Sequence, residues 1–265
     1  MTLIHLIHLI NPLYAISGLV IGMLVGFTGV GGGSLMTPLL VMAFGIHPAT
    51  AVGTDLLYAA ATKSVGTVVH GFGRTVDWGI VLRLAAGSVP ATALTLLALS
   101  RMGPTLDAGH GVITSVLGVA LILTAAAILF RRIILEFFAS RVRPLDPRRT
   151  TLFTVLLGAV LGVLVSLSSV GAGAIGVTVL LILYPKLPAA KLVGSDIAHA
   201  VPLTLLAGLG HWMMGSVNWA LLASLLTGSI PGIIVGSLLS SRAPDRVLRP
   251  ILASTLALVG GKLFF

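Results

Sequence analysis

The chain has 265 residues, of which 57% are hydrophobic and only 9% are charged. A soluble globular chain is about 25% charged, so this composition excludes a soluble fold and indicates an integral membrane protein. The absence of cysteine from this sequence excludes disulfides and thiolate metal sites. The formal charge of +9 does not indicate nucleic-acid binding, because six of the arginines lie between positions 131 and 149.

Apolar runs follow one another along the whole sequence, separated by short polar segments. A membrane-spanning helix needs about 20 apolar residues, and most of the runs reach or approach that length. Runs 33–44 and 174–184 are too short to cross a bilayer alone, because a helix rises only about 1.5 Å per residue. We therefore predict an all-α, polytopic membrane protein with about 8–10 membrane segments. The runs are 12–30, 33–44, 49–70, 78–100, 108–130, 151–169, 174–184, 189–211, 219–240 and 248–265.

The second half of the sequence repeats the first. The segment from Gly22 to Gly33 reads GMLVGFTGVGGG, and the segment from Gly162 to Gly173, 140 positions later, reads GVLVSLSSVGAG. After a one-residue insertion, Gly-Thr-Asp at 53–55 aligns with Gly-Ser-Asp at 194–196. Three further matches, of a histidine, a Val-Asp/Asn-Trp run and a Gly-Ser-Val/Ile-Pro run, follow in the same order. Apolar bias alone would not align these polar residues in order.

The arginine-rich segment divides the chain. It predicts a cytoplasmic loop over 131–150, between a first membrane repeat over 12–130 and a second over 151–265, because loops rich in lysine and arginine stay in the cytoplasm. Counting spans outward from this loop places corresponding points of the two repeats on opposite sides of the membrane. This is an inverted-topology repeat, a common construction of secondary transporters. Whether 12–44 and 151–184 are re-entrant hairpins or single broken spans stays open.

A glycine-rich break separates a long apolar run from a short one in each repeat. A half-helix that begins after such a break points its free N–H groups and the positive end of its dipole into the bilayer. Two such ends would form an anion site near the midplane, whereas close helix packing through small residues is the alternative. The substrate-binding residues predicted in the breaks are Gly31, Gly32, Gly33, Ser34, Gly171 and Gly173.

Three charged residues lie inside the apolar runs. Asp55 and Asp196 occupy matched positions, and a carboxylate in a membrane span is costly enough to indicate a function. We predict that they either couple transport to H⁺ or Na⁺, or cap the free N–H groups of a half-helix. Lys63, about two turns after Asp55, is predicted either to bind the substrate or to neutralise Asp55, because a buried lysine needs a partner.

Polar residues beside the two acids complete the predicted site. Thr54 and Ser195 directly precede the acids and are predicted to bind the substrate through their hydroxyls. His199 lies one turn after Asp196 and is a candidate proton relay, because its charge can change near neutral pH. We predict no metal site, no cofactor and no catalytic residue, since the spans contain no HExxH or GxSxG spacing.

The glycine motif over Gly22–Gly33, the following Pro38 and the run from Pro48 to Asp55, all followed by the repeat in the second half, resemble the TauE/SafE family. Members of this family are described as sulfite or organosulfonate exporters. The resemblance covers about residues 13–262 and implies a bacterial inner-membrane, multi-pass permease that moves a small anion. The second repeat departs from the glycine motif at Ser166, Ser169 and Ala172, so the two halves are predicted to contact the substrate differently.

Residues and resemblance together predict a secondary transporter that exports sulfite, or a related sulfur oxyanion or organosulfonate, by alternating access. The alternative is a passive channel for anions or solutes, or a permease for an unrelated small anion. The predicted partners are the small anionic substrate, the lipid bilayer and a coupling ion, H⁺ or Na⁺, with no nucleic acid. The sequence does not determine the substrate, the coupling ion or the oligomeric state, and the direction of transport rests on the resemblance alone.

Overall fold

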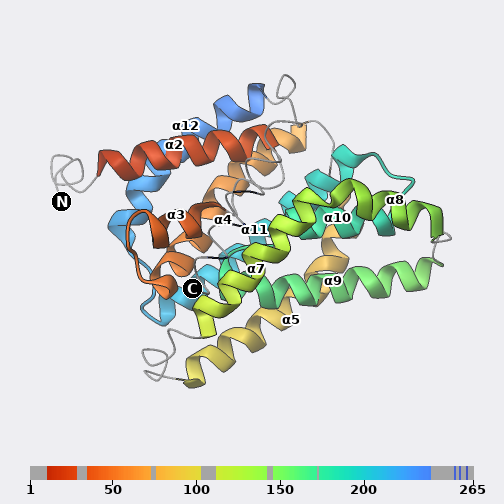
Figure 1. Cartoon of the computed structure of the whole chain (residues 1–265), viewed down its shortest axis with the longest axis horizontal. Helices are drawn as coiled ribbons and strands as arrows, with labels where there is room; N and C mark the ends of the chain where they lie inside the picture. The colour runs from red at the N-terminus through yellow and green to blue at the C-terminus, as the bar shows by residue number, and fades with distance from the viewer. Residues whose placement is uncertain are drawn as a thin grey trace.

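A computed structural model of the chain describes residues 11–28, 35–72, 76–102, 112–141, 146–171 and 173–239, together with residues 254, 257 and 261. The regular elements within these ranges are α-helices, as the long apolar runs predict. Figure 1 shows them. In chain order they are α2 (Pro12–Thr28), α3 (Met36–Met42), α4 (Pro48–Phe72), α5 (Trp78–Met102), α7 (Val112–Leu129), α8 (Arg131–Arg141), α9 (Pro147–Ser168), α10 (Ala174–Leu183), α11 (Ala189–Met213) and α12 (Trp219–Leu239).

Within the described ranges, four helices are long and apolar enough to cross a membrane, namely α5, α9, α11 and α12. A fifth crossing results if α7 and α8, which meet at a bend of 67°, count as one span. Helix α4 also has 25 residues, but Asp55, Lys63 and its other polar residues lower its hydropathy. Helices α2 and α10 are apolar and shorter. The chain is therefore an all-helical, polytopic membrane protein.

The arginine-rich segment between the two predicted repeats contains a helix, α8, over Arg131–Arg141, and its cytoplasmic location stays a prediction. Helix α8 carries an ion pair one turn apart, with 2.7 Å between Arg132 Nε and Glu136 Oε1, and such pairs stabilise helices. Ile133 and Phe137 are 62% and 50% exposed on the same helix. A short helix with basic and exposed apolar side chains is typical of a membrane interface. In the sequence, the many arginines of this segment made its apolar face hard to recognise.

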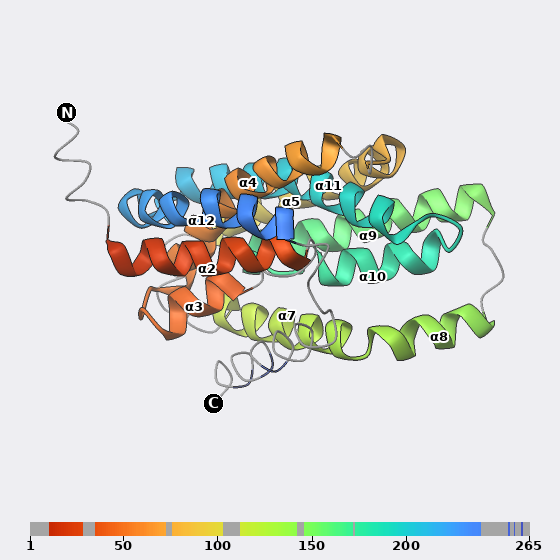
Figure 2. The same ribbon diagram turned by 90° about the horizontal axis from the view of Figure 1, so that it is seen from above.

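Six of the helices form three pairs, and each pair has one member from each half of the sequence. Helices α2 and α12 lie along one edge of the molecule, α5 and α9 along the opposite edge, and α4 with α11 between them (Figure 1). Seen from above, α7 and α8 follow one another along one face of the molecule (Figure 2). Because each of these pairs joins a helix of the first half of the sequence to a helix of the second half, neither repeat folds as a separate body.

Glycines bring the two outer pairs into backbone contact. A Cβ atom at Gly18 of α2 would meet the carbonyl of Leu225 in α12, and a Cβ atom at Gly158 of α9 would meet the carbonyl of Leu84 in α5. Gly158 is the repeat mate of Gly18, and Leu225 is the repeat mate of Leu84. The same contact thus occurs twice, with the two halves of the sequence exchanged.

The central helices α4 and α11 run antiparallel. Gly53 of α4 lies against the backbone of Ser216, just after α11, while Leu57, one turn further along α4, lies against Gly208, further back in α11. Residue numbers therefore rise along one helix while they fall along the other. Helices α4 and α11 carry the matched Gly-Thr-Asp and Gly-Ser-Asp runs, so these two matched segments point in opposite directions.

Each short helix folds back along the helix before it. The hydroxyl of Tyr184, directly after α10, lies 2.9 Å from that of Thr154, near the start of α9. In the first repeat, the ring of Tyr14 near the start of α2 packs edge-on against Phe44 after α3, with 4.8 Å between centroids. A single broken span would carry the members of each pair to opposite sides of the membrane. The α2–α3 and α9–α10 segments are therefore hairpins, which decides between the two alternatives that the sequence leaves open.

Candidate functional site

The second glycine break is an irregular stretch of backbone between α9 and α10. Helix α9 ends at Ser168, and Ser169 has a left-handed φ of 58°. Gly171 and Gly173 have φ angles of 113° and 112°, which glycine adopts without the steric penalty that a Cβ atom imposes. Glycine at these positions thus lets the backbone turn from one helix into the next. The first break, with Gly31, Gly32, Gly33 and Ser34, lies outside the described residues.

Asp55 caps the short helix of its own repeat. Its Oδ2 atom accepts hydrogen bonds from the backbone N–H of Thr37, at 3.2 Å, and from the Thr37 hydroxyl, at 2.5 Å. Thr37 lies in the first turn of α3, where backbone N–H groups have no partner within the helix. Both side chains are fully buried. This geometry matches the capping alternative for Asp55, and the positive end of the helix dipole stabilises the carboxylate.

Asp196 occupies the equivalent place in the second repeat. It accepts a hydrogen bond from the backbone N–H of Gly173, the residue before α10. A Cβ atom at Gly176, in the first turn of α10, would overlap Asp196 Oδ1, so glycine lets the carboxylate approach the helix start. The side chain of Asp196 is 1% exposed, and its Oδ1, like that of Asp55, has no hydrogen-bond partner among the described residues.

Lys63 lies between the two acids in the middle of α4. Its ammonium group interacts electrostatically with Asp196 and, more weakly, with Asp55. Neither carboxylate forms an ion pair with it within 4.0 Å in the described part of the chain. Both acids are sealed from the surface, whereas Lys63 keeps some accessible surface although protein atoms surround it. Lys63 is therefore the least buried of these three charged side chains.

The second glycine break contacts Asp55 at its start and Asp196 at its end. The Ser169 hydroxyl, at its start, faces the Asp55 carboxylate, although Ser169 Oγ and Asp55 Oδ1 form no hydrogen bond of good geometry among the described residues. Gly173, at its end, donates to Asp196. Because each acid touches this break, the structure brings Asp55, Asp196, Gly173 and Lys63 of the predicted site together.

His199 lies one turn from Asp196 on α11 and is fully buried. Its Nε2 is 2.8 Å from Ser88 Oγ, and which atom donates depends on the tautomer. Its Nδ1 has no partner within the described ranges, and Lys63 acts on it electrostatically. The relay role of His199 stays a prediction. No three histidine, aspartate or glutamate side chains of the described residues come close enough to hold a metal ion.

The hydroxyls of Thr54 and Ser195 contact loops rather than the break. Thr54 Oγ1 accepts a hydrogen bond from the N–H of Asn218, at 3.0 Å. Ser195 Oγ accepts one from the N–H of Asp77, at 2.8 Å. Each bond joins α4 or α11 to a loop of the other repeat, namely the loop before α12 for Thr54 and the loop before α5 for Ser195. In this structure both hydroxyls thus hold loops in place, and their predicted role in substrate binding stays a prediction.

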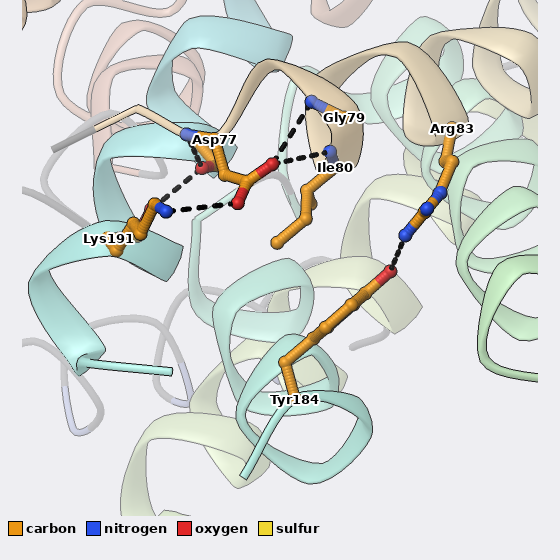
Figure 3. A network of polar contacts seen from close by, with 7 residues as sticks. Asp77, Gly79, Ile80, Arg83, Tyr184 and Lys191 are labelled. Carbon is orange, nitrogen blue, oxygen red and sulfur yellow. Dashed lines mark hydrogen bonds and ion pairs between the residues drawn. The ribbon is translucent and has the colours of Figure 1, made fainter. Parts of the chain in front are cut away.

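A polar network links three helices at one end of the molecule. Lys191 Nζ in α11 pairs with Asp77 Oδ2 at 3.2 Å, while Asp77 Oδ1 accepts from the N–H groups of Gly79 and Ile80 in the first turn of α5. Figure 3 shows this group beside a second contact, in which Arg83 donates to the Tyr184 hydroxyl at 3.2 Å. Together these bonds connect α5, α10 and α11.

The Asp77–Lys191 pair predicts a small, pH-dependent contribution to stability. Partial burial opposes ionisation of Asp77, but the hydrogen bonds and charge of Lys191 and the N–H groups of α5 outweigh it, so the pKa of Asp77 lies below its usual value. A lowered folded-state pKa stabilises the protein above the unfolded pKa, and this is lost as the pH falls through the folded pKa. We expect Asp77→Asn to cost at most about 1 kcal/mol at pH 7, because the pair is partly exposed.

The measurement is the unfolding temperature of purified protein in detergent at pH 7 and near pH 3. We expect Asp77→Asn to lower it at pH 7 and to lower it less near pH 3. Lys191→Met should remove the same stability, and the double variant should lose little more. Equal destabilisation at both pH values would show that the side chain stabilises the loop without its charge.

Three residues of the site were missed in the sequence. Thr37 binds Asp55, Ser88 binds His199 and Ser169 faces Asp55. A signal existed for Ser88, because the Gly-Ser-Val-Pro run that contains it recurs in the second half. Thr37 also has a repeat mate, Thr178, 141 positions later. Hydroxyl residues are common in membrane helices, so neither match identified a contact.

Known proteins similar to this chain are membrane transporters by name. The family model described as "Sulfite exporter TauE/SafE" matches residues 14–263. The chain is 39% identical over 249 residues to the probable membrane transporter protein YjnA of Bacillus subtilis (strain 168), covering 93% of this chain and 96% of that relative. It is 29% identical over 256 residues to the probable membrane transporter protein YdhB of the same organism, covering 92% and 96%. No solved structure matches the chain.

Proposed function

This chain belongs to the sulfite exporter TauE/SafE family of membrane transporters, and from that premise we propose that it exports a small anion by alternating access. Sulfite, or a related sulfur oxyanion or organosulfonate, is the proposed substrate. The family and the names of the relatives indicate a transporter and not an enzyme. The proposed location is the inner membrane of a bacterial cell, with the arginine-rich segment around α8 in the cytoplasm.

Lys63 is the observation that carries the anion assignment. It is an accessible cation at the middle of a membrane helix, beside an irregular stretch of glycine-containing backbone. An ammonium group inside a membrane is costly and marks an ion pathway. In the proposed site the anion pairs with Lys63 and accepts hydrogen bonds from backbone N–H groups of the breaks, which include Gly171.

The arrangement of the repeats supports alternating access. Corresponding helices α4 and α11 run antiparallel and carry the charged residues, and inverted repeats with a site between them are the usual basis for opening to one side at a time. The Asp77–Lys191 ion pair links the loop before α5 to α11 at one end of the molecule. The equivalent residues at the other end are Asn218 and Thr50, which cannot form an ion pair. We infer that the two ends open with different ease.

Flux into proteoliposomes of purified protein tests this function. We would supply sulfite, thiosulfate, sulfate and methanesulfonate, each with and without a pH or Na⁺ gradient. Saturable flux of one of them that follows an ion gradient is expected. Flux without saturation and without any effect of the gradients would indicate a channel. No flux of any of the four, from protein that is correctly inserted, would overturn the sulfur-anion assignment.

A further inference from the structure

The two acids of the site differ in how well their negative charge is stabilised. Asp55 accepts two hydrogen bonds from Thr37 and also faces the Ser169 hydroxyl. Among the described residues, Asp196 accepts a backbone hydrogen bond from Gly173 and has Lys63 as its source of opposite charge. Lys63 in turn acts more strongly on Asp196 than on Asp55. Asp196 is thus the acid that depends on Lys63.

An anion that binds Lys63 changes the surroundings of Asp196. The anion neutralises the ammonium charge that stabilised the carboxylate. Within the described residues, Asp196 then remains a buried carboxylate with a hydrogen bond from Gly173 and no partner for its Oδ1. An unpaired charge in a protein interior costs several kcal/mol, and a buried carboxyl group avoids this cost by taking up a proton.

The geometry points to Asp196 as the coupling site of the transporter: we propose that it binds one proton whenever an anion binds Lys63, so that proton and anion cross the membrane together. The proton comes from the water on the side where the anion enters, forms an O–H bond with Asp196 Oδ1, and leaves when the anion is released. This inference rests on the proposed function and adds the coupling ion and its site.

The other titratable groups near Asp196 are less suited to this role. Asp55 keeps its hydrogen bonds from Thr37 when Lys63 is neutralised. His199 shares α11 with Asp196, and its Nδ1 has no partner among the described residues, but a neutral imidazole suffers no penalty when a neighbouring cation is neutralised. Tyr58 has a buried hydroxyl near Asp55, with Ser229 and Thr62 beside it, and a phenol stays protonated near neutral pH.

The test uses methanesulfonate and sulfate as probes in weakly buffered proteoliposomes, because both anions keep their charge above about pH 4 and any proton movement then belongs to the protein. With wild type, we expect anion entry to make the external solution more alkaline, by one proton per anion. Entry of methanesulfonate should be insensitive to an imposed membrane potential, since one proton balances its single charge. We expect Asp196→Asn to abolish the pH change and to make its flux depend on the potential.

Matched variants separate coupling from folding. Asparagine at position 196 still offers an oxygen to the N–H of Gly173, so the hairpin should remain capped. Asp55→Asn and His199→Gln should keep the proton movement per anion, even where they slow transport. Anion flux without protons in the wild type, flux driven by Na⁺ instead, or proton movement that persists in Asp196→Asn would each overturn the inference while the proposed function stands. No flux in the wild type of these two probes, of sulfite or of thiosulfate would overturn both.

Discussion

Lys63→Ala is expected to lower anion flux by about 10- to 150-fold while the protein still folds and inserts. A hydrogen bond to a charged group contributes about 1.5–3 kcal/mol, and each 1.4 kcal/mol corresponds to about a tenfold change in binding. Lys63 is the cation beside the second break that keeps accessible surface, so its loss leaves Asp55 and Asp196 to repel the anion. The measurement is initial flux into proteoliposomes, normalised to inserted protein.

Lys186→Met is the matched control for the loss of one positive charge. Lys186 lies exposed in the segment between α10 and α11, so its substitution should leave the flux within about a factor of two, as expected for an exposed residue away from the site. Lys63→Arg keeps the charge and should retain more flux than Lys63→Ala. Flux of Lys63→Ala at the wild-type level would remove Lys63 from the substrate site and leave it as a partner of the two acids.

Gly87→Val is expected to prevent the α5–α9 pair from forming as it stands. Even a Cβ atom at Gly87 would overlap the carbonyl of Val155 and lie 2.7 Å from the backbone N of Ala159. Backbone atoms cannot move aside without separating the helices. Overpacking in a well-packed region costs about 1–3 kcal/mol and sometimes more. The overlap of the new side chain with the backbone of α9 arises in any arrangement that keeps α5 and α9 in contact at this point. The measurement is the unfolding temperature and the monodisperse fraction in detergent.

Gly79→Val, at the start of the same helix, is the control. A Cβ atom there would meet only the side chain of Asp77, at 3.2 Å, which a shift of a few tenths of an ångström relieves, so the unfolding temperature should fall much less than with Gly87→Val. The repeat also predicts that Gly228→Val is as damaging as Gly87→Val, because Gly228 meets the carbonyl of Ala15 in the equivalent pair. A tolerated Gly87→Val with normal flux would contradict the close backbone contact.

Much of the fold could be predicted because the bilayer limits the possible structures. Every backbone group in hydrocarbon needs an internal partner, so apolar runs of about 20 residues become helices. The matched Gly-Thr-Asp and Gly-Ser-Asp runs predicted the repeat, and Gly18 and Gly158 make the same contact with the two halves of the sequence exchanged. The helical nature of 131–141 was missed because the arginines drew attention away from Ile133 and Phe137.

The polar contacts of the site could be predicted less well. The sequence placed Asp55 and Asp196 beside the breaks, but it left open whether they cap a helix or couple transport. Capping depends on which N–H groups lie within about 3 Å of the carboxylate, and that distance arises only when α3 and α10 fold back. Thr54 and Ser195 show the same limit. They directly precede the acids in sequence, yet the helix turns their hydroxyls toward the loops at Asn218 and Asp77.

The sequence by itself determined the class of protein, the repeat, the position of the breaks and the identity of the buried charges. These properties follow from composition and from local spacing, which the chain carries whatever its folded form. Only the tertiary structure decided that the α9–α10 segment is a hairpin, that α4 and α11 run antiparallel, and that Lys63 acts more strongly on Asp196 than on Asp55. Each of these depends on distances between residues far apart in the chain, because helix packing, and not sequence order, sets which charges meet.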